Sequence, residues 1–311
     1  MKIVFLERNS LGLDLDLQRF EALGEVVYYA QTADDQVPER VKDADVVIAN
    51  KVPMNAQTLG QAERVKLVCL TATGTDNLDK PYLEKAGIAW RNAAGYSTEP
   101  VAQHTFALYF YLAEKLAYFD HFVKSGEYSK SETFTGFGRV FEELWGKTWG
   151  IIGMGTIGRR VAEIATAFGA RVIYYSTTGN NRSAGYPCVD LDALLSESDV
   201  VSVHAPLNAT TEGMMNREAF QKMKSGAYFI NVGRGKIVVD ADLADALECG
   251  EIRGAALDVL SKEPMAKENP LLRIQDSDKL LITPHVGWAS IEARTRLIGI
   301  VEQHIKDFME T

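Results

Sequence analysis

The sequence predicts an α/β protein built from two doubly wound parallel-sheet domains. Short apolar runs rich in Val, Ile and Tyr alternate with segments of helical periodicity along the whole chain, which is the pattern of βαβ units. With 311 residues, 46% of them hydrophobic and 24% charged, the chain has globular composition and enough length for two cores. A polar, glycine-rich stretch at 124–147 separates two series of strands and indicates the division into two domains.

The first series predicts one doubly wound unit. Strands are expected at 3–7, 26–30, 45–50, 65–72 and 88–93, and helices that end at glycine at 15–24 and 82–87. A Ser/Thr and Glu-Pro start signal then opens a long helix that reaches to about residue 123. This helix is apolar on most faces, so it is expected to be buried or to lie in an interface.

The second series follows the polar stretch, which is expected to form an extended arm. Strands are predicted at 148–153, 171–176, 200–206, 227–233, 254–259 and 279–285, and the first five are each followed by a helical or loop crossover. The last stretch, 289–310, is amphipathic and is expected to fold back onto the first unit as a helix.

Charge and cysteine content exclude several classes of protein. A formal charge of -9 and a pI near 5.2 argue against a nucleic-acid or anionic-membrane surface. The three cysteines, Cys69, Cys188 and Cys249, are far apart and odd in number, which favours a reducing compartment without disulfides or a metal site. The apolar run at the N-terminus is too short for a signal peptide, and no run is long enough to span a membrane. We therefore expect a cytoplasmic protein.

A phosphate-binding loop is predicted at the start of the second unit. Residues Gly153 to Gly158 form GMGTIG, between the strand at 148–153 and a helical stretch at 159–169. This context makes G-x-G-x-x-G strong evidence for dinucleotide binding rather than a plain glycine turn. Gly153 would allow the tight turn, Gly155 the approach of the pyrophosphate, and Gly158 the close packing of helix and strand.

The end of the next strand leaves the coenzyme open. In the common NAD version an acidic residue about 20 positions further on binds the adenosine ribose. Here the strand ends in Ser176, followed by Thr177, with Arg182 nearby and no carboxylate. Without that negative charge the hydroxyls and Arg182 could bind the 2′-phosphate of NADP, and Ser176 could equally bind the ribose of NAD.

Histidines are the first candidates for proton transfer near neutral pH. Of the five, His204 and His285 each close a strand of the second series, at the edge where such sheets bind ligands. His104, His121 and His304 lie in predicted helices, where packing or surface roles are expected. His204 suits a loop beside the dinucleotide, and His285, which follows the last strand, is the expected acid and base.

The same edge carries an arginine and two carboxylates. Arg234 stands between glycines in NVGRG, and its planar, permanently charged guanidinium suits a carboxylate substrate. Glu263 could pair with the imidazole of His285, fix its orientation and raise its pKa. The alternative for Glu263 is a solvated loop residue before Pro264. Asp258 lies near the end of the strand predicted at 254–259, at the same edge.

The segments GMGTIG, VHAPL, NVGRG, LDVLSKEP and TPHVGWAS, in this order, resemble the D-isomer-specific 2-hydroxyacid dehydrogenase family along nearly the whole chain. The resemblance implies that Arg234 binds the carboxylate and carbonyl oxygen of the substrate, that His285 is the acid and base, and that Glu263 pairs with it. It places the substrate carboxylate on the backbone of Thr73, Gly74 and Thr75. Further implied cofactor contacts are Thr156, Ile157, Pro206, Thr211, Val232 and, at the nicotinamide carboxamide, Asp258.

The resemblance also implies the domain roles. Residues 1–98 and 287–311 are expected to form a discontinuous, flavodoxin-like substrate domain, and residues 99–286 an inserted Rossmann domain for NAD or NADP. The apolar helix from Glu99 and the arm around 128–141 imply a homodimer joined through the cofactor domain.

Within the family, the segments around Lys51, at 72–79 and at 284–294 resemble the glycerate dehydrogenase or hydroxypyruvate reductase branch. Trp288 would narrow the pocket beside His285 and favour a small, polar substrate, so that Lys51 and Trp288 are the substrate-discriminating residues. The expected reaction is the reduction of hydroxypyruvate to D-glycerate, with glyoxylate as a further substrate. Alternatives are a dehydrogenase of D-lactate or 3-phosphoglycerate, or a dinucleotide-sensing binding protein like the corepressors that share this fold.

Overall fold

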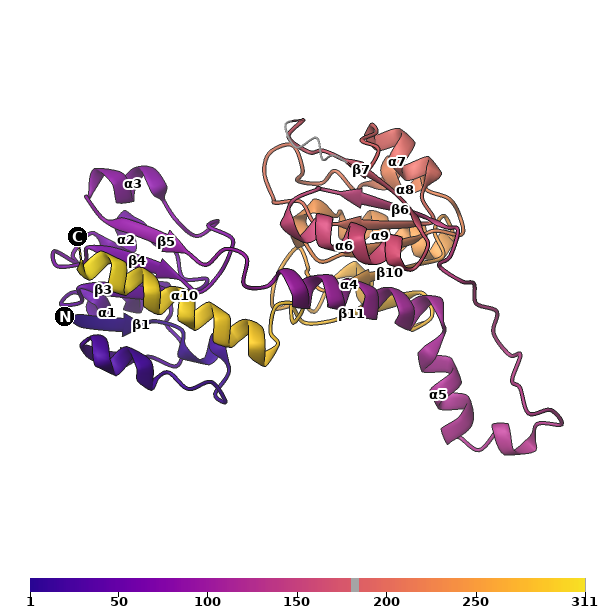
Figure 1. Cartoon of the computed structure of the whole chain (residues 1–311), viewed down its shortest axis with the longest axis horizontal. Helices are drawn as coiled ribbons and strands as arrows, with labels where there is room; N and C mark the ends of the chain where they lie inside the picture. The colour runs from indigo at the N-terminus through magenta and orange to yellow at the C-terminus, as the bar shows by residue number, and fades with distance from the viewer. Residues whose placement is uncertain (180–184, 311) are drawn as a thin grey trace. The chain divides into compact units, whose positions relative to one another are not determined.

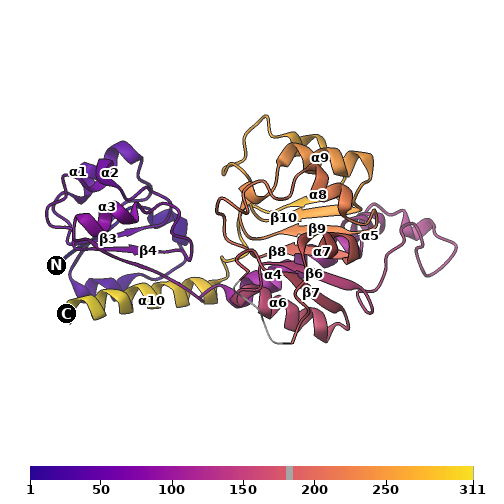
Figure 2. The same ribbon diagram turned by 90° about the horizontal axis from the view of Figure 1, so that it is seen from above.

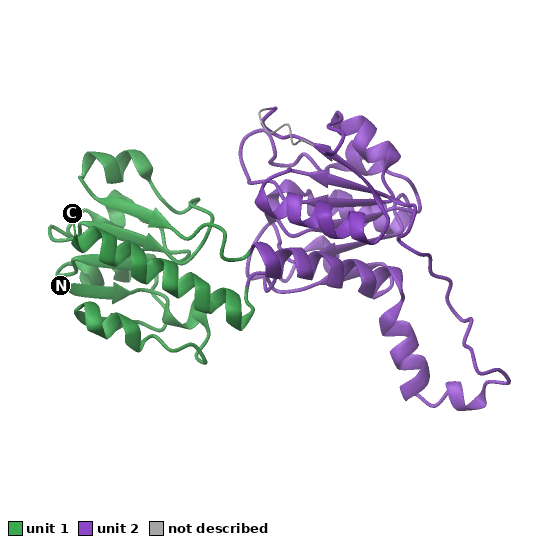
Figure 3. Cartoon of the chain, in the orientation of Figure 1, with its two compact units in different colours: residues 1–97, 289–311 green, residues 98–288 purple. Residues whose placement is uncertain are grey.

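The computed structural model describes residues 1–179 and 185–310 and divides the chain into two compact units (Figure 3). Unit 1 comprises Met1–Ser97 and Ala289–Thr311, and unit 2 comprises Thr98–Trp288. The expected boundaries at 98 and 287 lie one and two residues from these. Each unit has its own parallel sheet with helices on both faces, so the predicted α/β class with two parallel-sheet domains is confirmed.

Unit 1 contains a five-stranded sheet in the order β2-β1-β3-β4-β5, with every neighbouring pair parallel. This is the flavodoxin-like order. The strands are β1 (Lys2–Phe5), β2 (Glu25–Tyr28), β3 (Val46–Ala49), β4 (Leu67–Leu70) and β5 (Ala89–Asn92). β3 and β4 are buried at every position, which explains why their sequences are continuous apolar runs rather than alternating ones.

Helices cover both faces of this sheet (Figure 2). One face packs against α1 (Val37–Val41), α2 (Ala56–Leu59) and α3 (Lys80–Lys85), and the other against α10 (Ile291–Met309). The Ser290 hydroxyl caps α10 by accepting a hydrogen bond from the Ala293 N–H at 3.2 Å. Four of the five buried side chains of α10 recur at a spacing of four residues and give the helix one apolar stripe toward the sheet: Ala293, Leu297, Val301 and Ile305.

Unit 2 contains a six-stranded parallel sheet in the order β11-β10-β9-β8-β6-β7. The strands are β6 (Thr148–Ile152), β7 (Arg171–Tyr175), β8 (Val200–Val203), β9 (Tyr228–Asn231), β10 (Gly254–Leu257) and β11 (Leu280–Ile282). Beyond β7, Cys188 forms a single parallel bridge with Tyr174. This bridge takes the place of the third strand in the Rossmann order 3-2-1-4-5-6, reduced here to one residue.

Two helical layers enclose the second sheet (Figure 2). α4 (Thr98–Ala113) and α6 (Thr156–Ala167) cover one face, and α7 (Leu191–Glu197), α8 (Arg217–Lys222) and α9 (Asp240–Cys249) cover the other. Trp149 of β6 is fully buried. Its ring centroid lies 4.7 Å from that of Phe106 and 5.2 Å from that of Tyr109, both on α4. The apolar character of α4 is thus explained by core packing within unit 2.

Two helix predictions are wrong in detail. Residues 15–24 do not form an α-helix, because only Gln18–Leu23 are helical and they form a 3-10 helix, the tighter form used for short stretches. The long helix after residue 97 is not continuous, because Lys115 adopts a left-handed backbone (φ 56°) that ends α4 and starts α5 (Leu116–Lys124). Further 3-10 helices are Arg8–Leu11, Asp34–Gln36, Tyr128–Lys130, Gly235–Ile237 and Pro270–Arg273.

The segment after α5 forms the expected extended arm. Figure 1 shows α5 and the chain up to β6 standing away from the sheet of unit 2. Four of its large apolar side chains are 74–92% exposed: Phe134, Phe137, Val140 and Trp145.

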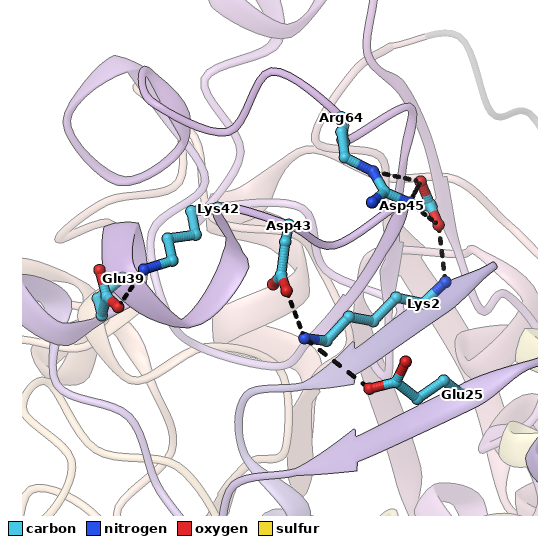
Figure 4. Close-up of polar contacts among 7 residues, drawn as sticks. All are labelled: Lys2, Glu25, Glu39, Lys42, Asp43, Asp45 and Arg64. Atoms are coloured by element: carbon cyan, nitrogen blue, oxygen red, sulfur yellow. Dashed lines mark hydrogen bonds and ion pairs between the residues drawn. The ribbon is translucent and has the colours of Figure 1, made fainter.

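An ionic cluster lies at the amino end of the first sheet (Figure 4). The ammonium of Lys2 lies 2.7 Å from Asp43 and 3.9 Å from Glu25, while its backbone N–H donates to Asp45. Arg64 holds the same Asp45 carboxylate at 2.9 Å. These charges pair with one another at the starts of the strands of unit 1. The predicted site residues of that unit lie at the other edge of the sheet, where the strands end.

The described residues contain no helix that is both long and apolar enough to cross a membrane. Their three cysteines are free thiols; Cys69 is buried, while Cys188 and Cys249 are exposed. Within residues 1–179 and 185–310, no group of three or more His, Cys, Asp or Glu side chains is arranged to hold a metal ion.

Candidate active site

The sheet of unit 2 brings the predicted residues of that unit to one edge. All its strands are parallel, so their carboxyl ends meet on the same side. At least one predicted site residue comes within three residues of the end of each strand. From β6 to β11 these residues include Gly153, Ser176, His204, Arg234, Asp258 and His285. In open α/β sheets this edge is where ligands bind.

The first and last glycines of the phosphate loop are required by close packing. Gly153 has φ 94°, and a Cβ there would lie 2.8 Å from the backbone nitrogen of Ala205. A Cβ on Gly158 would lie 2.2 Å from the carbonyl oxygen of Gly153. The two glycines thus let α6 begin directly against the end of β6.

The middle glycine leaves an open approach to α6. Gly155 is the N-cap and has no side chain with which to bond the first amides of the helix. Apart from its chain neighbours, no described atom lies within 4 Å of the position its Cβ would take. Thr156 and Ile157 form the first turn, and the dipole of this twelve-residue helix favours an anion at its start. The geometry fits the pyrophosphate of a dinucleotide.

The end of β7 also fits a dinucleotide. Among the described residues, the Ser176 hydroxyl is one of two buried side-chain groups without a hydrogen-bond partner, the other being Nδ1 of His204. Buried polar atoms are nearly always bonded, so an unpaired hydroxyl at this point is consistent with a missing ribose partner. Thr177 follows it and is partly buried. Arg182, the expected partner of a 2′-phosphate, lies outside the described residues.

His204 differs in character from His285. Its Nε2 lies 3.0 Å from the Ser202 hydroxyl, which accepts a hydrogen bond from Nε1 of Trp149 at 2.8 Å. Burial lowers the pKa of His204 to about 3, so its imidazole is neutral at pH 7. A neutral imidazole at this position agrees with the expectation that His204 lies beside the dinucleotide and that His285 is the acid.

The loop after β8 is held by one hydroxyl. Thr211 is fully buried, and its Oγ1 donates to the carbonyl oxygen of Pro206 at 2.7 Å and accepts from the Asn208 N–H at 2.9 Å. Pro206 and Thr211, both expected at the cofactor, are therefore parts of one rigid turn. Val232, after β9, is partly buried against the core beneath α4 and α6.

His285 and Glu263 form a bonded pair. Nδ1 of His285 lies 2.7 Å from Oε2 of Glu263, and the Leu260 N–H donates to Oε1 of the same carboxylate at 3.0 Å. The side chains of His285 and Glu263 are 27% and 32% exposed, so both remain accessible to a small molecule. A carboxylate on Nδ1 fixes the ring and leaves Nε2 as the nitrogen that exchanges a proton with a ligand.

Asp258 shapes the loop that carries His285. Its buried carboxylate accepts hydrogen bonds from the Thr283 hydroxyl at 2.6 Å and from the N–H groups of Val286 and Gly287 at 2.9 and 2.8 Å. Burial raises the pKa of Asp258, but hydrogen bonds from His104, Thr283 and these amides outweigh burial and lower it below its usual value. Asp258 thereby binds the residues on both sides of His285, which has a left-handed backbone (φ 56°).

Arg234 lies on a loop that is fixed from two sides. Asn231 is fully buried, and its side chain accepts from the Gly233 N–H and donates to the carbonyl oxygen of Arg234, both at 3.0 Å. A Cβ on Gly235 would lie 1.8 Å from the backbone of Leu260. The loop of Arg234 therefore rests directly on the loop that carries Glu263.

Unit 1 positions its own predicted residues at the carboxyl edge of its sheet. The carboxylate of Glu7 accepts backbone hydrogen bonds from Asn50, Lys51 and Val52 at 2.6–3.2 Å, and so orients the loop of Lys51. The carbonyl oxygen of Thr73 accepts a bond from the Asn92 side chain at 2.7 Å. The turn of Thr73, Gly74 and Thr75 is thus tied to the end of β5. Trp288, the last residue of unit 2, is partly buried.

Sequence reasoning overlooked three residues that shape these loops: Glu7, Asn231 and His104. Glu7 ends the strand predicted at 3–7, and Asn231 lies near the end of the strand predicted at 227–233, so both positions at the ligand edge held a usable signal. His104 was expected only to pack in a helix, and its Nε2 in fact lies 3.0 Å from the Thr283 hydroxyl and 3.3 Å from Asp258. No local pattern on a helix indicates such a distant partner.

Comparison with known proteins identifies the family. Residues 106–287 match the family model described as D-isomer specific 2-hydroxyacid dehydrogenase, NAD binding domain. The chain is 36% identical to a hydroxypyruvate reductase of Blautia hydrogenotrophica, over 100% of this chain and 97% of the relative. It is also 36% identical to a glycerate dehydrogenase of Methylorubrum extorquens, over 99% and 96%.

Solved structures agree in fold over nearly their full length. An acyclic imino acid reductase in complex with NADPH and D-Arg superposes with a TM-score of 0.88 at 27% identity, covering 100% of this chain and 97% of that one. D-lactate dehydrogenase from Aquifex aeolicus, complexed with NAD and lactic acid, gives 0.86 at 28% identity, covering 99% and 95%. The chain belongs to the D-isomer-specific 2-hydroxyacid dehydrogenase family and is an oxidoreductase that uses NAD or NADP to interconvert a 2-oxo acid and its 2-hydroxy acid.

Proposed function

We propose that the protein reduces hydroxypyruvate to D-glycerate, with Arg234, Glu263 and His285 as its catalytic residues. The observation that carries the proposal is the 2.7 Å contact between Nδ1 of His285 and Glu263 at the ligand edge of a dinucleotide-binding sheet. Relatives named hydroxypyruvate reductase and glycerate dehydrogenase match over essentially the whole chain, which supports this substrate.

The proton chemistry falls to His285. Bound NADH or NADPH supplies the hydride for C2 of the 2-oxo acid. His285, with Nδ1 bound to Glu263, presents Nε2 to the carbonyl oxygen and donates the proton that turns it into a hydroxyl. Glu263 stabilises the imidazolium before the transfer, and in the reverse direction the neutral imidazole accepts the proton from the hydroxyl.

Arg234 is proposed to hold the substrate by its carboxylate and carbonyl oxygen. A guanidinium offers two parallel N–H donors, which match a planar 2-oxo carboxylate, whereas lysine offers a single point charge. Arg234→Lys should therefore raise KM about tenfold or more, a loss of at least about 1.4 kcal/mol of binding. An unchanged KM for every 2-oxo acid tested would exclude this role.

The cofactor residues follow from the edge of unit 2. The amides after Gly155 are proposed to bind the pyrophosphate, and Ser176 and Thr177 the adenosine ribose or its 2′-phosphate. The remaining proposed contacts are Thr156, Ile157, His204, Pro206, Thr211, Val232 and Asp258. Unit 2 is accordingly proposed as the dinucleotide-binding domain and unit 1 as the substrate domain.

Substrate choice is proposed to depend on Trp288 and Lys51, together with the backbone of Thr73, Gly74 and Thr75. An indole beside His285 would exclude long side chains, and a small polar acid such as hydroxypyruvate or glyoxylate would remain. The deciding experiment measures kcat/KM for hydroxypyruvate, glyoxylate, pyruvate and 3-phosphohydroxypyruvate, each with NADH and NADPH. A preference for pyruvate or for the phosphorylated acid would replace the proposed substrate, and no turnover of hydroxypyruvate would reject it.

A homodimer joined through unit 2 is proposed as the assembly. Its support is the arm, in which Phe134, Phe137 and Val140 are 82–92% exposed, far more than apolar side chains of this size usually are. The double substitution Phe134→Asp with Phe137→Asp should convert the protein to a monomer in light scattering at micromolar concentration. A wild-type monomer under the same conditions would refute the dimer. The three free thiols support a cytoplasmic location.

A further inference from the structure

We infer that His104, on α4, is a positioning residue for the catalytic histidine and acts through Thr283 and Asp258. The inference rests on the proposed role of His285. It begins from three contacts: Nε2 of His104 lies 3.0 Å from the Thr283 hydroxyl and 3.3 Å from Oδ1 of Asp258, and that hydroxyl lies 2.6 Å from the same Oδ1.

Proton accounting fixes the direction of these bonds. The Thr283 hydroxyl has one hydrogen, and the 2.6 Å contact with a carboxylate that can only accept gives that hydrogen to Asp258. The hydroxyl then has only lone pairs to offer His104, so Nε2 of His104 must carry a hydrogen and donate. His104 therefore supplies the donor that completes the shell of Thr283 and of Oδ1 of Asp258.

The ring of His104 also closes the space around the loop. A Cβ on Gly287 would lie 3.2 Å from Cδ2 of His104 and 2.9 Å from Oδ2 of Asp258, so the ring packs over the backbone at Gly287. The side chains of His104 and Asp258 are 20% and 4% exposed, which keeps most solvent away from these bonds. In such surroundings a hydrogen bond is worth more than at the surface.

These contacts bear on His285 because they bind the residues on either side of it. Asp258 accepts from Thr283 before it and from Val286 and Gly287 after it. His285 between them has a left-handed backbone, which is uncommon for a residue with a side chain and is held only when its surroundings impose it. Without His104 the clamp loses one donor and its packing, and the imidazole of His285 loses its fixed position.

The test substitutes His104 and separates positioning from folding. His104→Ala should lower kcat about tenfold or more while KM and the Kd for the dinucleotide change less than threefold, because neither ligand touches His104 in this proposal. A looser proton donor makes the chemical step slower, so the primary isotope effect with dinucleotide deuterated at the transferred position should rise. His104→Gln keeps an N–H donor and should restore kcat to within threefold of wild type.

Gln103→Ala is the matched control, because Gln103 is the exposed neighbour on the same helix. All variants are assayed as full-length protein with the 2-oxo acid that the wild type reduces best, so an error in the proposed substrate leaves the test intact. Thr283→Val should lower kcat as His104→Ala does. The double variant should have a kcat no lower than that of either single variant, because Thr283 and His104 act in one network.

Three results for the single variants would overturn the inference. They are a kcat for His104→Ala within twofold of wild type, a glutamine variant as slow as the alanine one, and a loss that follows a fall in Tm rather than the chemical step. The variant is also made in the His285→Ala background, where it should have no further effect on the residual rate; a further loss would show that His104 does not act through His285. Failure of the proposed function itself would be recognised separately, because His285→Ala alone would then keep full activity.

Discussion

The two units have the same order for their first five strands but differ at the point where that order reverses direction. In unit 1 the chain reverses direction across the sheet between β1 and β3, and the carboxylate of Glu7, just after β1, binds the backbone amides of residues 50–52 after β3. In unit 2 the equivalent point lies between β6 and β8. There Gly153 packs against Ala205, and the first amides of α6 face the open space beside Gly155.

The difference shows how one side chain changes the use of a fold. A crevice at a topological switch point presents backbone N–H groups and attracts an anion. Unit 1 supplies that anion itself, as Glu7. Unit 2 has glycine in place of a carboxylate, so its amides are free of such a side chain and are proposed to bind the phosphates of a dinucleotide. The comparison predicts that changes at the edge of unit 2 alter catalysis or cofactor binding, whereas the switch point of unit 1 acts on its own loop.

The largest effect is expected from His285→Ala, because it removes the proposed acid from the edge of unit 2. General acid catalysis contributes about 10²- to 10⁴-fold, so kcat should fall by that factor. The Kd for NADH or NADPH, measured by nicotinamide fluorescence, should stay within threefold. His121→Ala, an exposed histidine on α5, is the control and should keep wild-type kcat. An unchanged kcat for the His285 variant would show that His285 of unit 2 does not transfer the proton.

Gly158→Ala should have the next largest effect, by closing the space that the comparison assigns to the phosphates. The added Cβ would lie 2.2 Å from the carbonyl oxygen of Gly153, so helix and loop must separate. We expect the dinucleotide Kd to rise about 10- to 100-fold, which corresponds to about 1.4–2.8 kcal/mol. Gly226→Ala, whose Cβ would meet nothing nearer than 3.6 Å, serves as the control. Equal Kd values for the two variants would contradict the role of the loop.

Asp258→Asn should destabilise unit 2 in a pH-dependent way. The pKa of Asp258 is lowered in the folded protein, so its carboxylate contributes stability above the unfolded value of about 3.9, and that contribution is lost as pH falls through the lower folded value. Calorimetry at pH 7 should show a loss of about 2 kcal/mol, because an amide oxygen replaces only part of the acceptor set. The gap between variant and wild type should narrow in acid. A gap that is constant with pH would mean that Asp258 is not held as a carboxylate.

Glu7→Gln should have the smallest effect and confine it to unit 1. The amide keeps one acceptor oxygen for the backbone of residues 50–52 and loses the charge, at a cost of about 1–2 kcal/mol. We expect a several-fold increase in substrate KM through the loop of Lys51, with the dinucleotide Kd unchanged. Glu25→Gln, at the opposite edge and 70% exposed (Figure 4), is the control for a lost carboxylate. A change in dinucleotide Kd would show that the two switch points are not independent.

The parts that could be predicted are those encoded locally. Continuous apolar runs located the parallel strands, because both faces of these sheets are buried, and the ends of those strands located the edge with Gly153, Arg234 and His285. The break at Lys115 was missed, since its sequence resembles helix on both sides and its cause is tertiary. Lys115 is 8% exposed and donates to the carbonyl oxygen of Asp278, 163 residues away.

The supporting residues of the site could not be found in the same way. His104 on its helix forms no such pattern, and its role depends on Thr283, a partner that only folding brings near. The proposed acid and base could be predicted from the sequence because the role calls for histidine, and the chain has only five. The hydrogen bonds that hold the backbone around His285 use common residue types and give no such signal. The place of Glu7 at the ligand edge could have been predicted, because it ends the strand expected at 3–7.

The contact between Gly235 and Leu260 has a consequence for how this enzyme could be redesigned. The loops of Arg234 and Glu263 touch backbone to backbone at this point, with no room for even one methyl group. Random mutagenesis should therefore find position 235 intolerant, although its residue touches no ligand. Trp288 and Lys51, the residues proposed to determine substrate choice, take no part in this backbone junction, so replacing them is expected to leave it intact. The close fit at Gly235 thus directs substitutions meant to change the substrate toward those two proposed positions.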